Sequence, residues 1–108
     1  MKEERILTLH PKGKKGVNIS LAKYDQIKNF ILVTLSTEKE ITFEALTDLA
    51  VSKLTDKFDG KVIWYLVTVK LDLEARKIIE RIPKTSPHKL RLHSSNTWKK
   101  PAHNSGLA

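Results

Sequence analysis

The sequence predicts an α+β fold in which three helices precede a two-stranded β-hairpin, and three observations predict it. Apolar residues recur at three- and four-residue spacings in three segments between residues 21 and 76. After residue 77 the period of the apolar residues changes from 3.6 to 2, which is typical of strands. The chain has 108 residues and no cysteine, so a single domain can bury a core without disulfides or cysteine-bound zinc.

Residues 1–19 predict a short strand followed by a basic loop. Residues 5–9, Arg-Ile-Leu-Thr-Leu, form a strand-like run that stops at Pro11. Residues 12–16 contain two glycines and three lysines, and this composition opposes regular structure. We therefore expect an N-terminal strand or arm ahead of the main domain.

The first helix is predicted over residues 21–36. Ser20 is a good N-cap, and Ile19 and Tyr24 are placed to form a hydrophobic staple around it. The helix has an apolar stripe that ends before the polar residues 36–40. Its members are Tyr24, Ile27, Phe30, Ile31 and Leu35.

The second helix is predicted to begin at Phe43 and to end near Thr55. Ile41 is a lone apolar residue, and Thr42 after it can cap the helix. One face of this helix is apolar and contains Phe43, Leu46, Leu49, Ala50 and Leu54. Residues 56–60 then form a turn of suitable length to join two helices at a steep angle.

The third helix is predicted over residues 60–76, with Asp59 as its cap and Arg76 and Lys77 at its C-terminal end. Its inward stripe contains Val62, Tyr65, Leu66, Val69 and Leu73, and its outer side contains Trp64, Val67, Thr68, Leu71 and Ala75. This outer face is apolar, and the charges of the helix balance. We expect Trp64 and Leu71 to be covered, either by the strand at residues 6–9 or by a second copy of the chain.

The C-terminal hairpin is predicted from residues 78–82 and 89–93, joined by a loop at residues 83–88. On the second strand, Leu90 and Leu92 face one way, whereas Lys89, Arg91 and His93 face the other. Residues 94–108 are polar and predict a flexible basic tail.

The order of these elements, with a short strand at Ile41, resembles a winged helix-turn-helix domain over residues 20–93. The junction at residues 73–81 is similar too, with Lys77 where such domains usually have glycine. The chain, including residues 7–16 and 58–65, also resembles a small family of uncharacterised bacterial winged-helix-like proteins. The winged-helix resemblance implies a third helix in the DNA major groove and a wing on the backbone or minor groove.

The net charge of +8 is concentrated at the two ends of the chain. The net charges of residues 1–19, 20–76 and 77–108 are +3, −1 and +6. This distribution predicts contact with polyanions, most simply the phosphates of duplex DNA. A charge excess that only keeps the protein soluble is the alternative.

Candidate phosphate contacts are cationic or hydroxyl residues on the basic loop, the third helix and the hairpin: Lys12, Lys14, Lys15, Lys61, Thr68, Lys84, Lys89 and Arg91. If about six cations paired with phosphates, the logarithm of the affinity would fall with log salt at a slope near −5. The outer face of the third helix lacks the side chains that read base edges. We therefore expect binding with little sequence preference.

Catalysis is not predicted. His10, His88, His93 and His103 show no metal-ligand spacing. The sequence contains neither a phosphate-binding glycine loop ending in Lys-Ser or Lys-Thr nor a nucleophile elbow. We expect no metal and no cofactor.

A cytoplasmic protein without membrane contact is expected. The longest apolar run, residues 62–67, is too short to span a bilayer, and no signal-peptide apolar stretch follows Met1.

Two functions remain open at this point. The first is a non-catalytic DNA-binding module, a dimer, that docks mainly through charge on the phosphate backbone. The second is a winged-helix domain for protein–protein interaction or dimerisation, which would use Trp64, Val67 and Leu71 on the outer face of the third helix.

Overall fold

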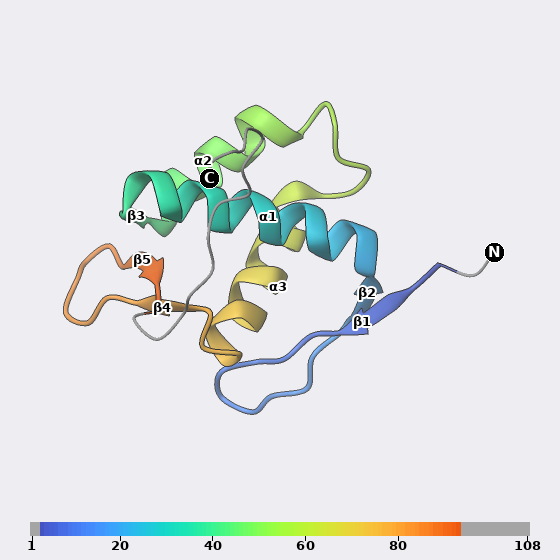
Figure 1. Cartoon of the computed structure of the whole chain (residues 1–108), viewed down its shortest axis with the longest axis horizontal. Coiled ribbons are helices and arrows are strands. Elements are labelled where there is room, and N and C mark those ends of the chain that lie inside the picture. Colours follow the sequence, from blue (N-terminus) through green and yellow to red (C-terminus); the bar gives the residue numbers. More distant parts are fainter. Residues whose placement is uncertain (1–2, 94–108) are drawn as a thin grey trace, which may run out of the picture.

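A computed structural model describes residues 3–93 and contains three helices and two small antiparallel sheets (Figure 1). The predicted α+β class is confirmed, and the predicted tail at residues 94–108 lies outside the described residues. In chain order the elements are β1 (Arg5–Leu7), β2 (Asn18–Ser20), α1 (Leu21–Glu38), β3 (Glu40–Thr42), α2 (Phe43–Leu54), α3 (Val62–Ala75), β4 (Ile79–Arg81) and β5 (Lys89–Leu92).

The first two helices begin at the caps that the sequence predicts. The Ser20 hydroxyl accepts a hydrogen bond of 3.3 Å from the Lys23 N–H, and the Thr42 hydroxyl accepts one of 3.1 Å from the Ala45 N–H. Helix α1 runs two residues further than predicted, and it ends at Lys39, whose φ of 71° cannot continue the helix.

The predicted cap of the third helix is wrong. Helix α3 begins at Val62 after Lys61, which provides no side-chain cap, and the Asp59 carboxylate instead lies 4.0 Å from Lys23 Nζ. Gly60 explains the later start, because its φ of 141° is far from helical. A Cβ at Gly60 would also lie 2.9 Å from the Tyr65 ring, so the turn requires glycine.

At its C-terminal end α3 closes with a lysine in the left-handed conformation. Lys77 has a φ of 62°, a conformation that usually favours glycine after a helix. The following Ile78 N–H donates a 2.9 Å hydrogen bond to the Leu73 carbonyl. This carbonyl is in the last turn of α3, where carbonyl groups have no partner within the helix. The chain then leaves α3 directly into β4.

The C-terminal hairpin, β4 with β5, forms a three-stranded antiparallel sheet with β3, in the order β3-β5-β4. Ile41 pairs with Leu90, and Ile79 pairs with Leu92. Leu90 and Ile79 are buried, so this sheet closes the core on the side of α1 and α2. The strands lie within the predicted ranges and are each shorter by at least one residue.

In the N-terminal hairpin, β1 was predicted and β2 was not. Strand β2 has only three residues, which are too few to show an alternation of apolar and polar side chains. Strand β2 pairs antiparallel with β1, with Ile6 opposite Ile19. The loop between them closes tightly: the Thr8 N–H donates to the Val17 carbonyl at 2.8 Å. A Cβ at Gly16 would lie 1.7 Å from the Thr8 carbonyl oxygen, so only glycine fits there.

The core lies where the apolar faces of the three helices meet, with α3 crossing beneath α1 in Figure 1. Four of the five residues predicted to face inward on α3 are buried: Val62, Leu66, Val69 and Leu73. The fifth, Tyr65, is half-buried at the edge of the core and packs edge-on against Phe58, with 5.0 Å between ring centroids.

Candidate functional site

Three of the predicted phosphate contacts lie on the loop of the N-terminal hairpin. Lys12, Lys14 and Lys15 are exposed and form no ion pair with any residue between 3 and 93. The loop passes close to the C-terminal end of α3 (Figure 1). Its position is fixed by the Leu9 N–H, which donates a 2.8 Å hydrogen bond to the Asp72 carboxylate.

Asp72 is buried where the N-terminal hairpin meets α3. From the sequence, it was expected only to offset the positive charges of the third helix. The side chain is 0% exposed. Besides the Leu9 amide, it accepts hydrogen bonds from the Tyr24 hydroxyl and from Arg76 Nε, the latter at 2.8 Å. One carboxylate thus joins α1, α3 and the N-terminal hairpin, and a buried charge with these partners is satisfied.

The same network keeps Tyr24 protonated. Burial of the phenol raises its pKa above the ordinary value of 10.0, and the hydrogen bond to Asp72 raises it further. The sequence indicated that such a partner exists, because Tyr24 lies in an apolar stripe and a buried hydroxyl needs a hydrogen-bond partner. The partner lies 48 residues away, so no local pattern could identify it.

The predicted contacts on the C-terminal hairpin separate into two kinds. Lys89 Nζ lies 3.2 Å from a Glu40 oxygen, and Arg91 Nε lies 2.6 Å from a Glu80 oxygen. These two cations therefore already face carboxylates. Lys84 is exposed in the loop of this hairpin and forms no ion pair with the residues that the structure describes.

Lys61 and Thr68 do not join this group. Lys61 is exposed at the N-terminal end of α3, and Thr68 is half-buried. A helix rises about 1.5 Å per residue, so the two ends of this helix are separated by roughly 20 Å. The structure instead adds exposed Lys77, just after α3, which sequence reasoning treated only as a helix end. We call Lys12, Lys14, Lys15, Lys77 and Lys84 the basic end of the molecule.

The outer face of α3 is exposed, so the strand at residues 6–9 does not cover Trp64, and coverage by a second copy of the chain stays a prediction. Trp64 is 46% exposed and Val67 is 36% exposed, whereas Leu71 is half-buried. The N-terminal hairpin packs at Asp72, near the C-terminal end of α3, and therefore leaves the first turns uncovered. The neighbouring Ile63, at 53%, is exposed as well.

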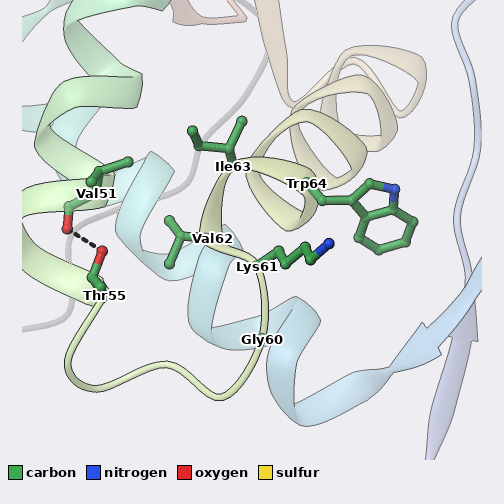
Figure 2. Close-up of a pocket in the computed structure, with 7 residues that line it drawn as sticks. All are labelled: Val51, Thr55, Gly60, Lys61, Val62, Ile63 and Trp64. Carbon is green, nitrogen blue, oxygen red and sulfur yellow. Dashed lines mark hydrogen bonds between the residues drawn. The ribbon is translucent and has the colours of Figure 1, made fainter.

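A shallow apolar hollow lies beside this face, between the end of α2 and the start of α3 (Figure 2). It has a volume of about 420 Å³ and is lined by Val51, Thr55, Gly60, Lys61, Val62, Ile63 and Trp64. In Figure 2 Val51 faces the start of α3, and the indole of Trp64 projects from the other side of Lys61. We call Val51, Ile63, Trp64 and Val67 the apolar face.

Within residues 3–93, which include His10, His88 and His93, no group of three His, Cys, Asp or Glu side chains could hold a metal ion, and His103 lies outside the described residues. His88 has a packing role instead. Its ring stacks on the Phe43 ring with 5.7 Å between centroids, and Lys70 Nζ lies 5.2 Å from the centroid of the Phe43 ring. His88 Nε2 is buried and has no hydrogen-bond partner within residues 3–93.

His88 should make the C-terminal hairpin sensitive to acid. Burial lowers its pKa below the ordinary 6.5, nearby Lys70 and Arg81 lower it further, and Glu74 raises it. A lowered folded pKa gives stability that is complete above pH 6.5 and is lost as the pH falls towards the folded pKa. We expect the urea midpoint to fall more between about pH 7.5 and about pH 5.5 in wild type than in His88→Phe. Equal losses in both proteins would contradict this role.

The chain is similar to one family of proteins. A family described as "Family of unknown function (DUF6958)" matches residues 5–90. The chain belongs to this family. The residues that match DUF6958 run from β1 into β5, so they include the N-terminal hairpin together with all three helices. Searches of curated proteins and of solved structures found no match.

A membrane-spanning helix must be both long and apolar. Within residues 3–93, no helix combines the length and the hydrophobicity that crossing a bilayer requires.

Proposed function

We propose that this DUF6958 member is a winged-helix module that binds nucleic acid through phosphate contacts made by its basic end. The element order and the sheet order β3-β5-β4 support the winged-helix assignment, with the C-terminal hairpin as the wing. The observation that carries the proposal is the basic end itself. It presents five exposed lysines without carboxylate partners among residues 3–93, on two loops and a helix terminus.

Charge on the backbone, rather than contact with base edges, supplies the affinity in this proposal. The exposed side of α3 carries Ile63, Trp64 and Val67 in place of the Arg, Lys, Asn or Gln side chains that usually read base edges. Lys70 is only 8% exposed and lies 2.5 Å from a Glu74 oxygen. The helix in the recognition position is therefore poor in groups that read sequence, and we expect weak discrimination between duplexes.

The structure changes the ranking of the predicted contacts. Exposed loop lysines without carboxylate partners can meet phosphates without breaking an ion pair. In contrast, Lys89 and Arg91 would have to weaken their ion pairs with Glu40 and Glu80. Lys14 and Lys15 are therefore better test positions than the pair on the wing.

We expect Lys14→Ala with Lys15→Ala to weaken binding to a labelled DNA duplex and to flatten its salt dependence. Each phosphate contact contributes about 0.9 to the slope of log affinity against log salt, so two lost contacts reduce the slope by about 2. Fluorescence anisotropy across a salt series measures both quantities. The matched control is Lys53→Ala with Lys57→Ala, because these exposed lysines on and after α2 remove the same charge away from the basic end.

Two results would count against the proposal. One is no binding by the wild-type protein at low salt. The other is an equal loss in the two double variants, since a general charge effect would not distinguish the loop from α2.

A second candidate function is a domain that binds a polypeptide through the apolar face. The observation that favours it is the exposure of three apolar side chains, Ile63, Trp64 and Val67, on one ordered helix. The two functions use different parts of the surface and do not exclude each other.

A further inference from the structure

We propose that the apolar face is a docking surface for a second copy of this chain, related to the first by a two-fold axis. This inference gives the second candidate function a definite occupant, and it does not depend on nucleic-acid binding. Three properties of the face support it: its exposure, its shape and its charge.

Three of the four exposed apolar side chains line the hollow, and the fourth, Val67, follows one turn further along α3. Ile63, Trp64 and Val67 are 53%, 46% and 36% exposed, and Val51 on the neighbouring α2 is 38% exposed. Beneath them Val62 and Leu66 are part of the core. The indole of Trp64 is held edge-on against Tyr65, with 4.9 Å between ring centroids. A preorganised aromatic side chain loses little conformational freedom when a partner covers it, as in typical interface anchors.

The shape of the face suits an identical partner. A two-fold interface must be self-complementary, because the same patch occurs on both sides. Here a projecting indole and an open hollow lie next to each other on one surface (Figure 2). Under a two-fold axis between them, each Trp64 can enter the hollow of the other copy. The hollow, at about 420 Å³, lies within the range of roughly 300–1,000 Å³ that accommodates organic groups.

The charge around the face favours a second copy over a polyanion. Residues 62–69 contain no charged side chain, in a chain whose net charge is +8. The turn at residues 56–61 borders the hollow and carries two aspartates and two lysines, so its charges cancel. Two copies are therefore not repelled at this surface, and Lys61 of each can meet an aspartate of the other. A neutral, apolar centre with a charged rim is the usual anatomy of an interface.

The location of the face leaves the basic ends free in such a dimer. Lys61 and the hollow lie at the start of α3, whereas Lys77 follows its end. The like charges of two basic ends would thus stay apart in the dimer, which lowers their repulsion.

Light scattering coupled to size exclusion, on the full chain without nucleic acid, tests the proposal. The wild-type mass should approach twice 12.3 kDa at high protein concentration and fall towards 12.3 kDa on dilution. Ile63→Asp should give 12.3 kDa at every concentration, because a charge would be buried in the interface. An acidic residue suits the first turn of a helix, so this variant should fold, as circular dichroism can verify.

Trp64→Ala is a second variant, and it should shift the equilibrium towards the monomer. The control is Leu7→Ala, because Leu7 is 60% exposed on β1 and does not line the hollow. We expect the control to dimerise as wild type does. A monomeric wild type at all concentrations would overturn the proposal, since the face would then serve another occupant. Dimers that persist unchanged in both Ile63→Asp and Trp64→Ala would overturn it as well.

The two proposals can fail independently. Lys14→Ala with Lys15→Ala should lose affinity for DNA and keep the mass of the wild-type dimer. Ile63→Asp should lose the dimer while each chain keeps its basic end.

Discussion

Replacing Asp72 with alanine should lower the free energy of unfolding by about 2–6 kcal/mol, because two donors lose their acceptor at about 1–3 kcal/mol each. The carboxylate is fully buried and accepts hydrogen bonds from Tyr24, Arg76 and the Leu9 amide. Its removal leaves the Tyr24 hydroxyl without a partner inside the core. Arg76, with 34% of its side chain exposed, can turn to solvent, so the lost hydrogen bonds of Tyr24 and Leu9 should dominate the cost.

Urea denaturation of the variant and of wild type measures this loss, with Asp48→Ala as the control. Asp48 is exposed on α2, so its replacement should change stability by no more than about 0.5 kcal/mol. Tyr24→Phe should cost less than Asp72→Ala, because the carboxylate keeps its two other donors. If Asp72→Ala were as stable as Asp48→Ala, the network would not be the anchor that we describe.

The same variant should loosen the basic loop. The Leu9 hydrogen bond to Asp72 tethers this loop to α3. Amide hydrogen exchange should therefore accelerate at Thr8 and Leu9 more than at Leu90 in the C-terminal sheet. Equal acceleration at both places would indicate global destabilisation without release of the hairpin.

Leu66→Ala should lower the free energy of unfolding by about 2–5 kcal/mol. Leu66 is 0% exposed on the inward side of α3, where the helix packs against α1 and α2. Truncation removes buried apolar surface and leaves a cavity that the neighbouring helices can close only in part.

The matched control is Leu7→Ala, which makes the same chemical change at a side chain that is 60% exposed. We expect this control to stay within about 0.5 kcal/mol of wild type at concentrations where the protein is monomeric. Similar costs at the two positions in urea denaturation would mean that α3 does not present Leu66 to the core.

Local chemistry made several features predictable from the sequence. Ser20 and Thr42 each accept a hydrogen bond from a helix amide three residues away, so a cap can be recognised within one turn. The inward stripe of α3 follows from helical spacing, and the shift to period 2 after residue 77 indicates the C-terminal strands.

Other features could not be predicted because their causes are distant in the sequence. Strand β2 exists because β1 pairs with it across a loop closed at Gly16. Helix α3 begins later than the cap at Asp59 would predict, because the backbone of Gly60 is not helical. Gly60 takes this conformation next to the rings of Phe58 and Tyr65. The ion pairs of Lys89 and Arg91 depend on the register of β5 against its two neighbours.

By itself, the sequence determined the helices, the C-terminal hairpin and the overall charge, since these depend on spacing and on neighbours within a turn or a strand. Only the tertiary structure decided the environment of a charged residue that is buried and of an apolar residue that is exposed. It buried Asp72 by placing three donors from three elements around it, and it left Trp64 exposed because the N-terminal hairpin packs elsewhere on α3. Both outcomes depend on which surfaces meet, and that choice is made by the packing of the whole domain.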